Sequence, residues 1–257
     1  MRPTVLAVLV ALAFPVTSAG AAPQAAAAGA VPAYVVAAIN DPARKDDSAN
    51  DDRRKIAALA TFAEVKPGQK VVDLIPGSGY FTRVFSAIVG PTGRVYAVWP
   101  NEYGKEAKSD VQASKALVAM PHYDNVGVLM VPAAQFKTPE KVDLVFTSQN
   151  YHDYPDAFMG KVDPVTFDKQ VFDSLKPGGV FVVVDHVAEA GSGMRDTDTL
   201  HRIDPAIVKQ QVESVGFVFD GESDVLRNPA DPHNIKVFDK SIRGHTDQFV
   251  YRFRKPG

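Results

Sequence analysis

The sequence predicts an α/β fold built on a doubly wound, mostly parallel sheet. Short runs of apolar and β-branched residues alternate with segments of helical periodicity through the middle of the chain. Turns rich in proline and glycine, at residues 66–68, 90–93 and 176–179, each separate a helical segment from the next strand. Strands and helices that alternate in this way form a parallel sheet with helices on both faces. No internal repeat or boundary divides the chain, so we expect one domain over residues 47–257.

The residues before this domain are predicted to direct export. Arg2, an apolar run over residues 5–16 and an Ala-Gly-Ala sequence at residues 19–21 are typical of a secretory signal peptide, here residues 1–21. The apolar run is too short to span a bilayer comfortably, so we expect cleavage, a periplasmic or secreted product and no stable membrane anchor. Residues 22–46 are expected to form a flexible lead-in that contains a short helix.

Individual elements follow from local patterns. Apolar residues recur with helical spacing over residues 56–63, behind a capping box predicted at residues 48–51. Asp163 and Asp204 each precede a proline, a pairing that favours the start of a helix. Further helices are expected over residues 34–39, 80–88 and 107–120. Strands are expected over residues 70–75, 94–99, 126–131, 142–148 and 180–184, with later candidates over 217–219, 235–238 and 248–253.

The composition of the chain excludes some classes of binding partner. The chain has 28 Lys plus Arg against 30 Asp plus Glu, which gives a net charge of −2 and no basic surface for nucleic acid. It contains no cysteine, so disulfides and a lipidated cysteine are excluded. We expect a small-molecule substrate; the oligomeric state is left open.

A glycine-containing loop is the sharpest motif. Residues 71–82 leave a predicted strand, turn at Gly77 and Gly79, and enter a predicted helix. Glycine allows a tight turn and close approach of a ligand, and a helix N-terminus offers free N–H groups. An ordinary strand-to-helix turn would show the same two glycines. The position of the loop after the first strand of an α/β series favours a ligand site.

This loop resembles motif I of the class I S-adenosyl-L-methionine (SAM)-dependent methyltransferases. Residues 175–179, Leu-Lys-Pro-Gly-Gly, resemble a late signature of the same family, and the resemblance runs from about residue 56 to the C-terminus. The chain is most similar to exported predicted methyltransferases with an Asn-Tyr-His-Asp motif, here residues 150–153. The resemblance implies a Rossmann-like, seven-stranded sheet whose last strand is antiparallel, in a methyltransferase-like domain that uses SAM.

The resemblance also implies a set of cofactor contacts: Asp73, Pro76, Gly77, Ser78, Gly79, Tyr80, Trp99, Glu102 and Gln149. Three positions depart from the family pattern. Ile75 stands where the first motif glycine is usual, Trp99 stands where an acid usually ends the second strand, and residues 131–134 offer no acid after the third. Two substitutes for the second-strand acid remain open: Glu102 reaches back, or Trp99 stacks on a ring.

Ligands of an open parallel sheet bind beyond the carboxyl ends of its strands. Residues 149–153, Asp185, His186 and His201 fall there. His152 is the candidate general base because its ordinary pKa lies near neutrality, and Asp153 or another carboxylate would orient it. Asn150 and Tyr151 are expected to orient the acceptor. A purely structural role for the motif, as a cap of the following loop, is the alternative.

These histidines and carboxylates are also metal-ligand types. No short metal-binding spacing occurs among them, so no metal ligands are predicted.

Three functions fit the sequence. The first is a SAM-dependent methyltransferase acting on a small molecule, with His152 as the base. The second is a non-catalytic exported protein that binds a small molecule and has lost SAM binding, which the departures at Ile75 and Trp99 favour. The third is an enzyme of another class in the same cleft, such as a metal-assisted hydrolase.

Overall fold

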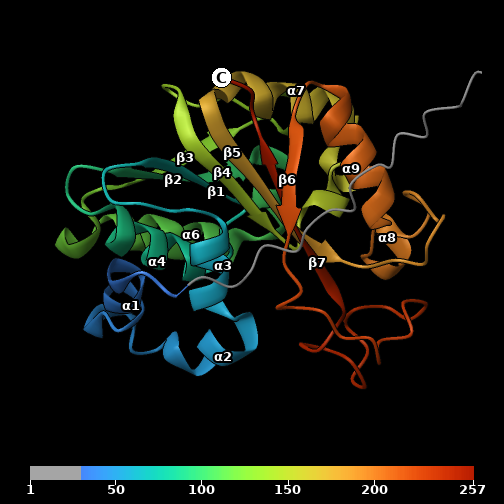
Figure 1. The fold of residues 1–257 in the computed structure, drawn as a ribbon, viewed down its shortest axis with the longest axis horizontal. Coiled ribbons are helices and arrows are strands. Elements are labelled where there is room, and N and C mark those ends of the chain that lie inside the picture. The colour runs from blue at the N-terminus through green and yellow to red at the C-terminus, as the bar shows by residue number, and fades with distance from the viewer. Residues whose placement is uncertain (1–29) are drawn as a thin grey trace, which may run out of the picture.

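The computed structural model describes residues 30–257. The predicted signal peptide and the first part of the lead-in lie outside the described residues. Figure 1 shows a twisted central sheet with helices packed on its two faces. None of the helices within residues 30–257 is long and apolar enough to cross a membrane.

The sheet has seven strands in the order β3-β2-β1-β4-β5-β7-β6. Strands β1 to β5 pair in parallel, and β7 runs antiparallel to both of its neighbours, β5 and β6. The predicted fold class and the antiparallel last strand are confirmed. The strands are β1 Lys70–Leu74, β2 Arg94–Pro100, β3 Val126–Val131, β4 Val142–Ser148, β5 Leu175–His186, β6 Val218–Glu222 and β7 Gln248–Arg254.

Both faces of the sheet are buried, because side chains alternate between two apolar clusters. On β5, Phe181 and Val183 join one cluster while Val182 and Val184 join the other. A strand that is covered on both sides needs a continuous apolar run, and this explains the run of valines in β5.

The helices divide between these two clusters. Helices α1, α3 and α4 pack into one cluster, while α7 and α9 pack into the other, on the opposite face (Figure 1). The helices are α1 Ala33–Ile39, α2 Asp51–Arg54, α3 Ile56–Phe62, α4 Tyr80–Val89, α5 Asn101–Glu106, α6 Lys108–Val118, α7 Pro164–Ser174, α8 Thr197–Leu200 and α9 Pro205–Ser214. The predicted starts of α7 and α9 are confirmed, since the carboxylates of Asp163 and Asp204 accept hydrogen bonds from the backbone N–H groups of Thr166 and Ala206.

The structure differs from the expected flexible lead-in over its second half. Helix α1 lies within residues 22–46, and its Val35 is fully buried in the cluster that holds α3 and α4. Arg44 is also buried, and its guanidinium lies 2.8 Å from the carboxylate of Asp51. Burial of an apolar side chain and pairing of a buried cation fix this segment to the domain.

Two local expectations are wrong. Ser48 begins a short 3-10 turn and donates its hydroxyl hydrogen to the carbonyl of Lys45, so it forms no capping box. Residues 235–238 form no strand, and the carbonyl of Ile235 accepts a hydrogen bond from Arg202 instead. A β-rich composition does not make a strand where no neighbouring strand is available for pairing.

Candidate active-site cleft

The glycine loop connects β1 to α4 with three residues in the left-handed region. Gly77 and Gly79 have φ values of 56° and 87°. Ile75 has a φ of 54°, although a β-branched residue pays about 1–2 kcal/mol there. Ile75 therefore adopts the left-handed conformation that glycine favours, at the position where motif I usually has its first glycine. Its N–H donates a hydrogen bond to the carbonyl of Val98.

A cleft of about 700 Å³ opens beyond the carboxyl ends of β1, β4 and β5. The glycine loop forms one end of its lining and the His152 region the other. Ten of the predicted site residues line it: Asp73, Pro76, Gly77, Ser78, Tyr80, Trp99, Gln149, Asn150, His152 and Asp153. His186 and His201 line the same cleft.

Two predicted residues point elsewhere, and Gly79 does not line the cleft. Tyr151 is fully buried in the apolar core, and its hydroxyl donates to Asp168 at 2.9 Å, so it is not placed to orient an acceptor. The carboxylate of Glu102 accepts a hydrogen bond from the N–H of Ala133 at 2.8 Å and caps the loop after β3. These are corrections, and both follow from packing that local sequence does not reveal.

Of the two substitutes for the missing acid, only Trp99 lies at the cleft. Its ring is buried and lies 6.1 Å from that of Tyr103, between centroids, and its indole N–H donates to Ser114. Tyr103 in turn donates to the side-chain oxygen of Asn150. An aromatic wall therefore stands where the family pattern has a carboxylate.

Asp73 is a buried carboxylate at the end of β1. It accepts a hydrogen bond from Thr82 at 2.6 Å. Burial raises its pKa to about 6, against the opposing effect of that hydrogen bond. An ammonium group in the cleft would find a partner in this carboxylate.

Sequence reasoning missed three charged residues of the lining, Arg54, Glu106 and Asp110. The guanidinium of Arg54 lies 4.6 Å from the ring centroid of Tyr80, and its Nε is buried without a hydrogen-bond partner among the described residues. Asp110 lies in the first turn of α6. In the sequence these residues appear only as a basic residue ahead of the first strand and acids at helix ends. Such features are too common to indicate a binding site.

The His152 side chain is held by a carboxylate from the neighbouring strand. Its Nδ1 donates to Asp185 at 2.8 Å, and its backbone N–H donates to the other oxygen of the same carboxylate at 2.9 Å. The short 3-10 turn Tyr151–Asp153 that follows β4 carries His152, and β5 carries Asp185. Because β4 and β5 are parallel neighbours, their ends meet at one edge of the sheet. The carboxylate at Nδ1 of His152 is thus that of Asp185, not that of Asp153.

The other ring nitrogen of His152 faces two further polar groups. Nε2 lies 3.3 Å from Nδ1 of His201 and 3.3 Å from a carboxylate oxygen of Asp153. Burial lowers the pKa of His152, but the charges of Asp185 and Asp153 outweigh burial and raise that pKa to about 9. The imidazole is therefore cationic at neutral pH when the cleft is empty of ligands.

His186 behaves differently. Burial lowers its pKa to about 4, so its ring is neutral at pH 7. Its Nδ1 lies 2.8 Å from the hydroxyl of Thr246. We assign it a structural role at the base of the cleft.

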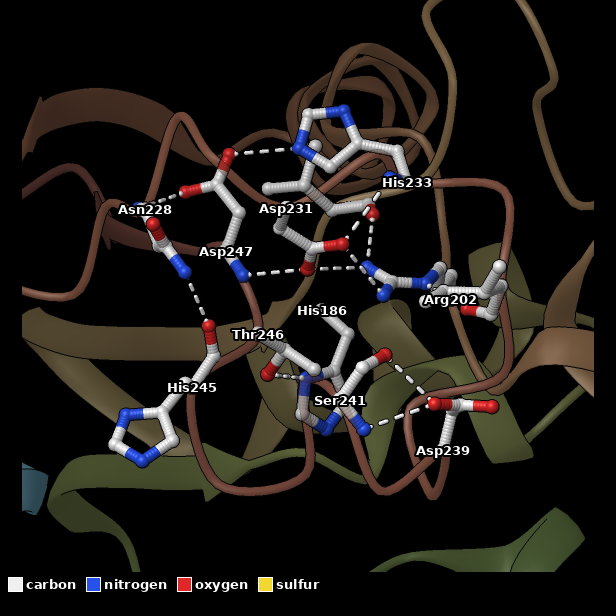
Figure 2. Close-up of polar contacts among 12 residues, drawn as sticks. His186, Arg202, Asn228, Asp231, His233, Asp239, Ser241, His245, Thr246 and Asp247 are labelled. Atoms are coloured by element: carbon white, nitrogen blue, oxygen red, sulfur yellow. Dashed lines mark hydrogen bonds and ion pairs between the residues drawn. The ribbon is translucent and has the colours of Figure 1, made fainter.

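A buried ion-pair network holds the segment between β6 and β7 beside the cleft (Figure 2). Arg202 forms a bidentate pair with Asp231 at 2.9 and 3.0 Å, and Asp231 also accepts from the N–H of Asp247. The same segment supplies Val237 and Phe238 to the cleft lining. No local sequence pattern predicts this anchoring, because its partners are far apart along the chain.

Comparison with known proteins agrees with the fold. Residues 46–139, which contain the glycine loop and β1 to β3, match the family model of protein-L-isoaspartate(D-aspartate) O-methyltransferase. The ubiquinone/menaquinone biosynthesis C-methyltransferase UbiE of Haemophilus ducreyi is 31% identical over 121 residues, which are 47% of this chain and 42% of that protein. The chain thus spans less than half the length of this curated relative.

Two solved structures share the architecture. A SAM-dependent methyltransferase from Aquifex aeolicus superposes with a TM-score of 0.56 at 18% identity, over 82% of this chain and 95% of that one. The [4+2]-cyclase SpnF gives a TM-score of 0.59 at 16% identity, over 79% and 80% of the two chains. The reactions named for these proteins differ, so the likeness fixes the fold and not the reaction. The chain has the fold of class I SAM-dependent methyltransferases, and its residues 46–139 match a methyltransferase family model.

Proposed function

We propose that this protein is a SAM-dependent methyltransferase that acts on a small molecule. The observation that carries the proposal is that the glycine loop and the His152 cluster open into one cleft. A cofactor at the loop would lie beside polar groups that can accept a proton from a nucleophile. The methyltransferase family match over residues 46–139 supports the same conclusion.

The residues present fit the charges of SAM. Asp73 offers a carboxylate for the ammonium of its methionine part, and Arg54, with a buried and unpartnered Nε, offers a cation for its carboxylate. No atom lies within 4 Å of the position that a Cβ of Gly77 would take, so the loop backbone there is open to a ligand. When bound, SAM supplies an electrophilic methyl group.

The chain's own residues would prepare the acceptor. Aromatic rings of Tyr103, Phe158 and Phe238 line the cleft and would hold the acceptor away from bulk water. His152 would take the acceptor's proton at Nε2, with Asp185 stabilising the resulting imidazolium. Before that step His152 must release its own proton, and His201, a quarter exposed and 3.3 Å away, offers a route to solvent.

Titration of SAM into the protein by calorimetry tests the proposal. Gly77→Ala places a methyl group in the open cleft and should weaken SAM binding at least about tenfold, or 1.4 kcal/mol. Gly160→Ala is the matched control: it too has positive φ and open space at Cβ, but it follows the 3-10 turn Ala157–Met159 and does not line the cleft. Both variants place an alanine in the left-handed region, so only the cleft variant should lose affinity.

Absence of heat and of a thermal shift at millimolar SAM would overturn the methyltransferase proposal. That result would favour the second candidate, a binding protein that keeps the fold without SAM. Equal affinity in Gly77→Ala and the wild type would show that the loop is not the SAM site.

A further inference from the structure

Three potential metal ligands converge at the floor of the cleft. Nε2 of His152, Nδ1 of His201 and a carboxylate oxygen of Asp153 form a triangle with sides of 3.3, 3.3 and 3.8 Å. They come from two segments on opposite sides of β5 in the sequence, the turn after β4 and the end of α8. The absence of a short sequence spacing therefore says nothing against a site here.

The size of the triangle matches metal coordination. Ligand atoms that form one face of a tetrahedron with these edge lengths lie about 2.1 Å from its centre, which is the usual bond length from zinc to imidazole nitrogen and carboxylate oxygen.

The ligand atoms are also held in place by their surroundings. Asp185 binds Nδ1 of His152, which turns the lone pair of Nε2 toward the triangle, as outer carboxylates do for metal-bound histidines. His201 has a φ of 54°, a left-handed conformation that is uncommon outside glycine and concentrates at functional sites. The His152 and Asp153 side chains are almost fully buried, while His201 is a quarter exposed.

We propose that His152, Asp153 and His201 form a binding site for a divalent transition-metal ion, with zinc as the best fit to two imidazoles and one carboxylate. Three protein ligands leave a fourth position open, and all three residues line the cleft, so an oxygen or nitrogen of a substrate can complete the coordination. The ion lowers the pKa of such a ligand and can activate it without a protein base.

Metal and proton compete for the same atom of His152. In the metal-bound protein Nε2 is a ligand, and the ion takes over activation of the acceptor from the imidazole. The inference goes beyond the proposed function and does not depend on SAM, because the ligands are complete without it. The two can therefore be tested separately.

The test is a calorimetric titration of the full chain, stripped of metal, with Zn²⁺ alone. We expect one equivalent to bind. His201→Gly removes a ligand without straining the backbone and should weaken binding by more than the roughly 10–100-fold expected for Asp185→Asn, which removes only an outer partner. His233→Gly is the matched control, because His233 is also left-handed, at φ 61°, and 27% exposed against 25% for His201.

Titration with Co²⁺ supplies a second readout, since the intensity of its visible absorption reports tetrahedral coordination. Circular dichroism of each variant checks that the fold is kept. Failure of the wild type to bind Zn²⁺, or equal affinity in His201→Gly and His233→Gly, overturns the metal site. Loss of SAM binding with Zn²⁺ binding intact would leave this inference standing and reject only the proposed function.

Discussion

Thr82 donates its hydroxyl hydrogen to the carboxylate of Asp73 across 2.6 Å, and both side chains are buried. One hydrogen bond does not compensate a carboxylate for the loss of water, so burial raises the pKa of Asp73 to about 6. In an unfolded chain the same group has its ordinary pKa, near 3.9. Asp73 is therefore a group whose ionisation opposes folding.

This relationship predicts a pH-dependent gain from Asp73→Asn. The folded protein holds the Asp73 proton more tightly than the unfolded one does. The stabilisation of the fold by this proton is therefore complete below pH 4 and is lost as the pH rises to about 6. At pH 7.5 the free energy of unfolding of the variant should exceed that of the wild type by up to about 3 kcal/mol, and at pH 4 the two free energies should be equal. Chemical denaturation at both pH values measures this, with Asp198→Asn at an exposed position as control.

The same variant should lose affinity for SAM, since the amide cannot pair with an ammonium. A more stable protein that binds less cofactor would show the exchange of stability for function that is common at active sites. A variant that is less stable than the wild type at pH 7.5 would contradict the interpretation of Asp73.

Ile75 provides a test of the loop conformation. At an ordinary strand position such as Val72, replacement by glycine is worse than replacement by alanine by roughly 0.5–1 kcal/mol. At Ile75 the order should reverse, because alanine retains the left-handed strain and glycine does not. We expect Ile75→Gly to be about 1 kcal/mol more stable than Ile75→Ala in denaturant titrations, and the opposite order at Val72.

The Arg202–Asp231 pair should behave as a buried ion pair. Both side chains are fully buried, so Asp231→Ala leaves an uncompensated cation and should cost about 3–5 kcal/mol. Replacing both residues, as in Arg202→Met with Asp231→Ala, should recover part of that loss. The exposed pair Lys169–Asp173 is the control, with an effect below about 0.5 kcal/mol. Hydrogen exchange of residues 227–247 should increase in the single variant and show whether the cleft wall loosens.

Much of the fold could be predicted because its determinants are local. The valine run of β5 and the Asp-Pro starts of α7 and α9 carry their own physical reason within a few residues. The strand expected over residues 235–238 failed because strand formation needs a partner, and partners are chosen by the whole sheet. Helix α1 was expected over residues 34–39, but its attachment to the domain was not, because that attachment comes from packing on α3 and α4.

The site was predictable only in outline. The sequence correctly predicts that Asp73, His152 and Asp153 lie at the carboxyl edge of the sheet, because each of them stands at or just after the end of a predicted strand. It could not foresee that Tyr151 turns into the core while its neighbour His152 faces the cleft. Nor could it reveal that Asp185 and His201 meet His152, because these contacts span 33 and 49 residues.

The position of β7 has a consequence for how the chain is made. This strand, Gln248–Arg254, lies between β5 and β6, so neither of these has its neighbour on that side until residue 254 has left the ribosome. Residues 175–186 are synthesised long before their partner, and the apolar edge of β5 stays open in the interval. A nascent chain is thus still incompletely folded when its final strand emerges, and until then the open edge of β5 can pair with a strand of another chain.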